Sequence, residues 1–182
     1  MANNNSITTF KEGFLGGTRA NRFVVEPVWP IGVNISAKDT SFKMVSASLP
    51  ASTMNTISVP YRGRLINFPG DRMYAPWNVG IYDDNNTNGI WKGLHQWAEF
   101  MDGHYTHKVK DNEFSYKKFQ TTWRMKQLDA NGDILKTITL YKCWPSVVDE
   151  ISLNMAEPGF VGFSTTLTFD YIKIQDKENY NS

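Results

Sequence analysis

Residues capable of catalysis are scattered along this chain, and none of the spacings typical of an active site occurs. The only cysteine, Cys143, lies between Tyr141 and Trp144 in an apolar stretch, which indicates a buried structural thiol instead of a nucleophile. There is no Gly-x-Ser-x-Gly elbow, and Gly16-Gly17-Thr18 lacks the lysine spacing of a phosphate-binding loop. The sequence therefore predicts no enzyme and no cofactor.

Metal binding is the second chemistry to test. The segment 84–89 matches the first half of a calcium loop, but the place of its closing bidentate glutamate is taken by a histidine, and a strand instead of a helix precedes it. A pair of histidines three residues apart has no cysteine or carboxylate partner at ligand spacing. Turn, cap and loop roles explain these residues, and a small metal-binding module remains the alternative. Its ligands would come from Asp84, Asn86, Asn88, His95, His104 and His107.

A segment that is interrupted by prolines and glycines, 49–84, carries four charged side chains in its central part, 57–72. No helix can cross it, because proline lacks a backbone donor and glycine permits unusual dihedrals, and any strand in it must bend or lie at an edge. These residues are either solvated loop charges, which have no specific role, or contacts at a protein interface. Arginine pairs readily with carboxylates at such interfaces. The length of the segment favours an interface, and the predicted contact residues are Arg62, Arg64, Asp71 and Arg72.

The elements around this segment are mostly strands. One helix is expected over 90–101, where apolar residues recur at helical spacing and place Trp91 and Trp97 on one face, with a cap at Thr87 or Asn88. A polar loop is expected over 34–41, and Asn131-Gly132 is a strong hairpin signal. The predicted strands are 22–28, 42–49, 77–82, 121–128, 134–143, 147–154 and 161–174.

The last two predicted strands would pair, and both alternate apolar with polar residues. One face then packs on the core while the other meets water. This water-facing side is rich in hydroxyls and mildly acidic, so it would repel nucleic-acid phosphates instead of holding them. Its residues are Glu150, Ser152, Asn154, Thr166, Thr168 and Asp170.

Composition sets further limits. A chain of 182 residues with 41% apolar side chains suits one domain with a substantial core. Its 19 basic and 18 acidic residues give a net charge of +1, which argues against binding nucleic acid through phosphate neutralisation. The polar start lacks the pattern of a signal peptide, and no apolar run is long enough to span a membrane. We expect one domain over 1–182, with a flexible arm at 1–20 and a flexible tail at 175–182.

Several short motifs follow one another in a recognisable order: Leu49-Pro50, Arg64 with Ile66-Asn67, Gly70-Asp71-Arg72, Trp77-x-Val79, Trp97, Trp144-Pro145 and Asp170-Tyr171. In this order and spacing the chain, from about residue 10 to residue 171, resembles the tail tube protein of T4-like contractile-tailed bacteriophages. No single motif is specific by itself. The stretch 29–42 is longer than the family pattern.

The resemblance implies a mainly β subunit, an antiparallel β-sandwich or barrel with one flanking α-helix and an extended loop or hairpin arm. Type VI secretion and pyocin tube proteins share this fold. The resemblance also implies a structural virion protein, assembled in the host cytoplasm, whose hexameric rings stack into a hollow tube inside the contractile sheath and conduct DNA into the host.

The implied partners are further copies of the chain, the tail sheath, the tape measure, and the baseplate and tail terminator proteins. The loop 57–72 would bridge stacked rings, and the water-facing side of the last strands would line the lumen, where DNA passes without specific binding. A baseplate initiator or a secretion-system ring protein of the same fold remains an alternative.

Overall fold

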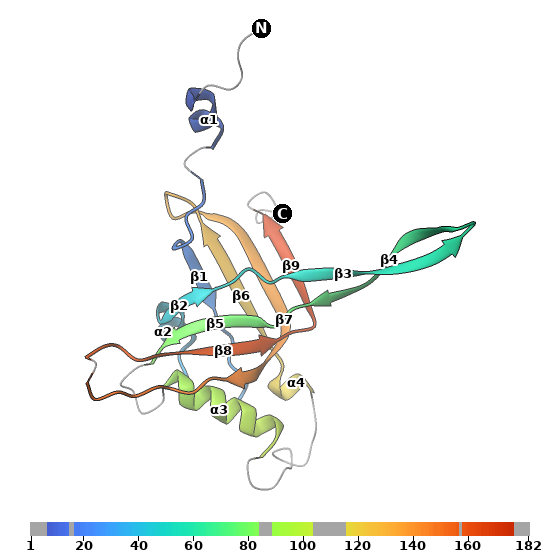
Figure 1. Ribbon diagram of the computed structural model, residues 1–182. Helices are drawn as coiled ribbons and strands as arrows, with labels where there is room; N and C mark the ends of the chain where they lie inside the picture. Colours follow the sequence, from blue (N-terminus) through green and yellow to red (C-terminus); the bar gives the residue numbers. More distant parts are fainter. Residues whose placement is uncertain (1–6, 15–16, 84–88, 104–115, 157, 177–182) are drawn as a thin grey trace.

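The body of the protein is an antiparallel β-sandwich whose two layers share one long strand, β7 (Ile134–Val148) (Figure 1). The computed structural model describes residues 7–14, 17–83, 89–103, 116–156 and 158–176. The first layer contains β1 (Phe23–Glu26), β6 (Thr121–Leu128), the first part of β7 and β9 (Tyr171–Asp176). The second contains β2 (Met44–Ala47), β5 (Trp77–Tyr82), β8 (Gly162–Thr168) and the end of β7. The mainly β sandwich expected from the sequence is confirmed.

Strand β7 passes from one layer to the other at a bulge. Lys142 has a φ of 59°, and the pairing register with β6 shifts opposite it. A bulge bends a strand and increases its twist, so the second half of β7 can turn into the other layer. Pro145 fits there because, from Trp144 onward, β7 pairs with β8 alone and its other edge needs no backbone donor.

Two of the strand predictions are wrong in their limits. The strand expected over 147–154 ends at Val148, and the segment 149–161 contains no regular strand among its described residues. The strand expected over 161–174 is two strands, β8 and β9, which both pair with β7 but lie in different layers. Alternation predicted the side-chain faces of β8 correctly, whereas Val147 and Leu153, expected on the packed face of the other strand, are exposed.

An aromatic core fills the space between the layers and is closed by α3 (Ile90–Met101), the predicted helix. Trp97 of α3, Trp123 of β6 and Trp77 of β5 are fully buried, and Trp29 contacts two of them edge to face. The indole of Trp97 donates to the carbonyl of Phe119 at 2.7 Å. Tryptophan buries a large apolar surface, so this cluster fixes how the layers and the helix meet.

The helix prediction was correct for the buried face but not for both indoles. Ile90, Leu94 and Trp97 are buried, whereas Trp91 is partly exposed and its indole lies 3.4 Å from the carbonyl of Asp149. Gly89 occupies the N-cap position; the expected cap residues Thr87 and Asn88 lie outside the described residues.

Three helices were not expected. The segment 1–20, expected to be a flexible arm, contains a helix, α1 (Ile7–Phe14). Most of the loop expected over 34–41 is helical: α2 (Ala37–Phe42) also includes the first residue of the strand expected over 42–49, and it is capped by Ser36, whose hydroxyl accepts from the Asp39 amide at 3.3 Å. A short α4 (Tyr116–Phe119) precedes β6. At the other end, β9 includes the first two residues of the predicted tail, 175–182.

Candidate assembly interface

The predicted arm is a β-hairpin that projects far from the body (Figure 1). Its strands are β3 (Ser52–Tyr61) and β4 (Arg64–Tyr74), paired antiparallel and joined by Arg62-Gly63. Both turn residues have positive φ, 47° and 79°, which matches the twist of a tight hairpin. Apart from half-buried Gly70 and Tyr74, every residue of the two strands is exposed. The hairpin therefore gains almost nothing from the core of its own subunit.

Only the base of the arm is anchored. The ring of Tyr74 lies 5.5 Å from that of Phe169, centroid to centroid, and the amide of Ala75 donates to the carbonyl of Ala51 at 3.1 Å. Beyond this base the two strands pair with each other, and their residues are exposed except for half-buried Gly70. Because an isolated two-stranded hairpin is marginally stable in water, this arrangement indicates that another surface covers the arm.

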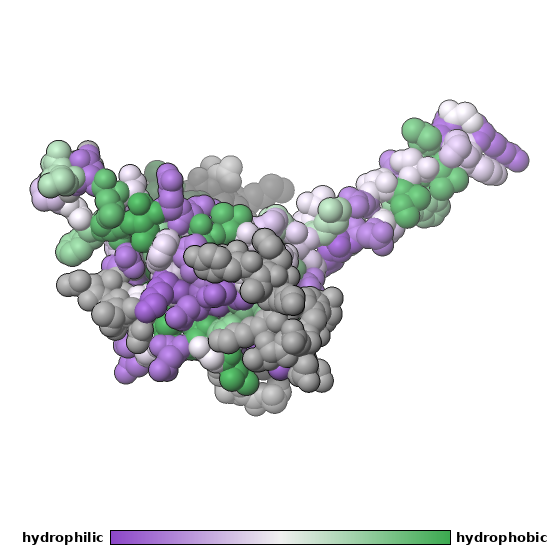
Figure 2. Space-filling view, turned by 90° about the horizontal axis from the view of Figure 1, so that it is seen from below, coloured by the Kyte–Doolittle hydropathy of each residue, from purple (hydrophilic) through white to green (hydrophobic). Residues whose placement is uncertain are grey.

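The pairing register gives the arm two different faces. On one face the cross-strand pairs Ile57 with Phe68 and Val59 with Ile66 are apolar, and all four side chains are exposed. On the other face Ser58 donates to the Asn67 side chain at 2.7 Å. An exposed apolar patch of this kind usually marks an interaction surface. We name the four residues Ile57, Val59, Ile66 and Phe68 the apolar arm face; Figure 2 shows hydrophobic and polar residues alternating along the projecting arm.

The charged residues predicted as contacts are spread around the arm instead of forming one cluster. Arg62 is in the turn with its guanidinium 5.4 Å from the Tyr61 ring centroid, and Arg64 follows on the apolar side. Arg72 pairs with Met54 beyond a bulge, so it belongs to the opposite face, and Asp71 lies in the bulge. All four are exposed, and the ion pairs among the described residues involve none of them. Net positive charge therefore gathers at the tip, where Arg62 and Arg64 lie, whereas Arg72 near the base follows Asp71 directly.

Sequence reasoning found the arm's charges but missed its apolar face. The signal was present in the alternation of Ile57 with Val59 and of Ile66 with Phe68 on either side of Gly63. The prolines of this segment concealed that alternation, since Pro60 and Pro69 argue against a regular ladder. Both are accommodated because neither strand of the hairpin has a neighbour on its outer edge.

The residues predicted on the water-facing side separate into two groups. Thr166 and Thr168 are half-buried on the outer side of β8, while Thr165 and Leu167, which alternate with them, face the core. Asp170 lies at the corner between β8 and β9, where its carboxylate binds Lys142 at 2.8 Å. This hydrogen bond raises the pKa of Lys142 above its ordinary value.

The second group is exposed but does not share that sheet face. Glu150, Ser152 and Asn154 lie past the end of β7, in the irregular segment 149–161. The expectation that they continue a strand beside β8 is therefore wrong. The neighbouring Asp149 is tied to the sheet, because its amide donates to the Ser164 carbonyl at 3.0 Å and its carboxylate accepts from the Ser164 hydroxyl.

Sites for catalysis or metal binding find no support in the described part of the chain. Cys143 is fully buried, and burial raises the pKa of its thiol to about 12, so it carries no thiolate at neutral pH. None of the described His, Cys, Asp and Glu side chains form a group of three that could hold a metal ion. Of the predicted ligands, only His95 lies in the described part, with its ring centroid 4.2 Å from that of Trp91; Asp84, Asn86, Asn88, His104 and His107 lie outside the described residues.

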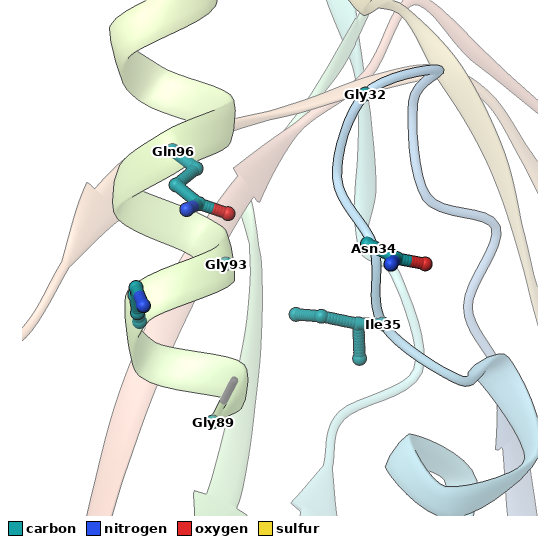
Figure 3. A pocket seen from close by; sticks show the side chains of 7 residues that line it. Gly32, Asn34, Ile35, Gly89, Gly93 and Gln96 are labelled. Atoms are coloured by element: carbon teal, nitrogen blue, oxygen red, sulfur yellow. The ribbon is translucent and has the colours of Figure 1, made fainter. Parts of the chain in front are cut away.

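A small recess lies between the loop before α2 and the first turns of α3 (Figure 3). Figure 3 shows the Ile35 side chain pointing across it toward α3, where a Cβ on Gly93 would come within 1.9 Å of the Ile35 Cδ1. Gly93 therefore permits close packing of loop on helix. Among the residues around the recess only Lys92 is ionisable, so it offers no acid–base pair.

None of the helices that the structure describes has the length and apolar character needed to cross a membrane.

Comparison with known proteins decides the family. The family model described as "Phage tail tube protein" matches residues 19–175, which include the arm and all the strands except the last residue of β9. The chain belongs to the phage tail tube protein family. It is 27% identical over 154 residues to tail tube protein gp19 of Enterobacteria phage T4, an alignment that covers 84% of this chain and 89% of that protein.

Two further similarities agree with this assignment. The tail tube protein of Serratia phage KSP90 is 27% identical over 119 residues, 65% of each chain. A chain from the structure of the anti-feeding prophage cap, which terminates a tube, superposes with a TM-score of 0.63 at 16% identity, over 87% of this chain and 91% of that one. At this low identity the superposition shows a shared fold. As a phage tail tube protein, the chain is a structural component of the virion.

Proposed function

We propose that this tail tube protein is the repeating subunit of a hollow tube, assembled from stacked hexameric rings inside a contractile sheath. The observation that carries the proposal is the arm, β3 and β4, which is exposed along its length and has an apolar face that the described residues of its own subunit leave uncovered. Burial of apolar surface is the main favourable term in most protein associations. A subunit that displays this surface gains stability when a neighbouring copy covers it.

The central part of the arm, 57–72, bridges neighbouring rings. The hairpin has one carboxylate, Asp71, against three arginines, Arg62, Arg64 and Arg72. Its net positive charge therefore favours contact with an acidic surface. In this account the bodies of the subunits hold each ring together and the arms hold stacked rings together. Charge reversal at two of these arginines therefore weakens stacking more than ring formation.

The lumen is lined by the outer face of the second layer. This face carries no charged side chain on the paired strands. It combines hydroxyl and amide groups with three larger side chains: Ser46, Asn78, Ser164, Thr166 and Thr168, together with Tyr82, Trp144 and Val147. Asp170 lies at its corner. A neutral wall allows DNA to pass because its paired face offers phosphates no cationic partner, and Lys142 at the corner is paired with Asp170. Glu150, Ser152 and Asn154 are not part of this wall, since they lie beyond the strands.

The subunit performs no reaction. Its partners in this account are other copies of itself, the sheath around the tube, the tape measure within it, and the baseplate and terminator proteins at its ends. A baseplate initiator or secretion-system ring protein would use the same body but would stop after one ring.

The test is charge reversal on the arm. The purified chain and its Arg64→Glu/Arg72→Glu variant are compared by electron microscopy and sedimentation, with Arg124→Glu on the exposed side of β6 as the control. We expect tubes for the parent and the control and short stacks or single rings for the arm variant. Unchanged tube length in the arm variant would reject the bridging role.

A further inference from the structure

The apolar arm face requires a complementary surface, and one is present at the other end of the same subunit. The segment 149–161 joins β7 to β8 and forms a loop on the side of the body opposite the arm (Figure 1). It exposes three large apolar side chains, Leu153 at 79%, Met155 at 108% and Phe160 at 94%. We name the described residues of 149–161 the receiving loop.

The charges of the two surfaces are complementary. The hairpin 52–74 contains Arg62, Arg64 and Arg72 against Asp71. The segment 149–161 contains three carboxylates in its sequence and no basic residue. The described carboxylate of Glu150 is exposed and close in sequence to the apolar residues, and Arg64 is exposed on the same side of the hairpin as the apolar arm face. Opposite charges at the rim of an apolar contact steer association and fix its register.

We propose that the apolar arm face of one copy docks on the receiving loop of the next copy, with Arg64 facing Glu150 across the contact. This inference rests on the proposed function and names the surface that accepts the arm. The apolar arm face and the receiving loop lie at opposite ends of the molecule. Each copy can therefore bind the arm of one neighbour on its receiving loop and dock its own arm on another neighbour. Such head-to-tail contacts are heterologous, and they propagate from copy to copy instead of ending at a dimer.

Cysteine cross-linking tests the geometry. A Val59→Cys/Met155→Cys variant is assembled, oxidised and separated on a denaturing, non-reducing gel; Cys143 is left in place because it is buried. We expect a ladder of covalent multimers beyond the dimer. The matched control is Leu65→Cys/Met155→Cys, whose arm cysteine is exposed on the opposite face of the hairpin, and it should yield at most a trace of the ladder.

A charge swap provides a second test that needs no cross-link. Arg64→Glu should raise the concentration needed for assembly about tenfold or more, and Arg64→Glu/Glu150→Arg should restore it to within a few-fold of the parent. Tubes without a ladder, a ladder in the control pair only, or failure of the double variant to restore assembly would overturn the docking site and leave the proposed function standing. A parent chain that stays monomeric would instead overturn the proposed function.

Discussion

Phe68 belongs to the apolar arm face, and its replacement by serine separates assembly from folding. In the isolated subunit the Phe68 residue is 51% exposed and paired across the hairpin with Ile57. Complete burial of a large apolar side chain contributes about 1.5–3 kcal/mol, so burial of the remaining half in a contact contributes about 1 kcal/mol. The substitution removes this contribution from every arm.

The loss multiplies because the arms of one ring act together. Summed over a hexameric ring, a loss of about 1 kcal/mol per arm becomes about 6 kcal/mol, or roughly four powers of ten in the equilibrium constant for adding a ring. Folding should change little, because Phe68 contacts no part of the buried core. We expect the unfolding temperature of the dispersed subunit to stay within about 2 °C of the parent.

Pelleting over a range of concentrations, checked by electron microscopy, measures assembly, and circular dichroism measures unfolding. Leu65→Ser is the matched control, since Leu65 is 68% exposed on the other face of the same hairpin. A role of the apolar arm face in assembly is refuted if Phe68→Ser assembles at the same concentration as the parent chain, or if Leu65→Ser weakens assembly as much as Phe68→Ser does.

Three further predictions concern the turns, the thiol and the core. Gly63 and Gly132 are turn glycines with φ of 79° and 90° and open space around them, so valine at either position strains the backbone by about 1–2 kcal/mol. Gly132→Val should lower the free energy of unfolding by this amount, whereas Gly63→Val should weaken tube assembly and leave unfolding nearly unchanged; the reverse pattern would contradict the independence of the arm. Because burial raises the pKa of Cys143 to about 12, iodoacetamide at pH 8 should leave the native chain unmodified and alkylate it in urea, and rapid native modification would show that the thiol is accessible. Trp97→Ala should cost about 3–5 kcal/mol in denaturant unfolding, because the indole is fully buried and donates to the Phe119 carbonyl; a loss under 1 kcal/mol would be inconsistent with the aromatic core.

The sequence predicted the features that depend on local pattern. Apolar spacing identified α3 and the burial of Trp97, and Asn131-Gly132 marked the β6–β7 hairpin. Strict alternation in β8 assigned Thr165 and Leu167 to the core and Thr166 to the outside.

Features that depend on distant contacts were beyond sequence reasoning. The change of layer at Lys142 follows from a bulge opposite β6, which no local signal specifies. The end of β7 at Val148 removed Glu150 from the predicted sheet face. The helix α2 was missed although Ser36 and Asp39 have capping spacing, because six residues are too few for a helical periodicity to be visible.

The central claim, that copies of this chain stack into a tube, is tested most directly by electron microscopy of the purified protein at high concentration. Our account predicts hollow, stacked rings whose neighbouring layers are bridged by the β3–β4 arm. Monomers that persist at high concentration, with the arm free in solution, would contradict it.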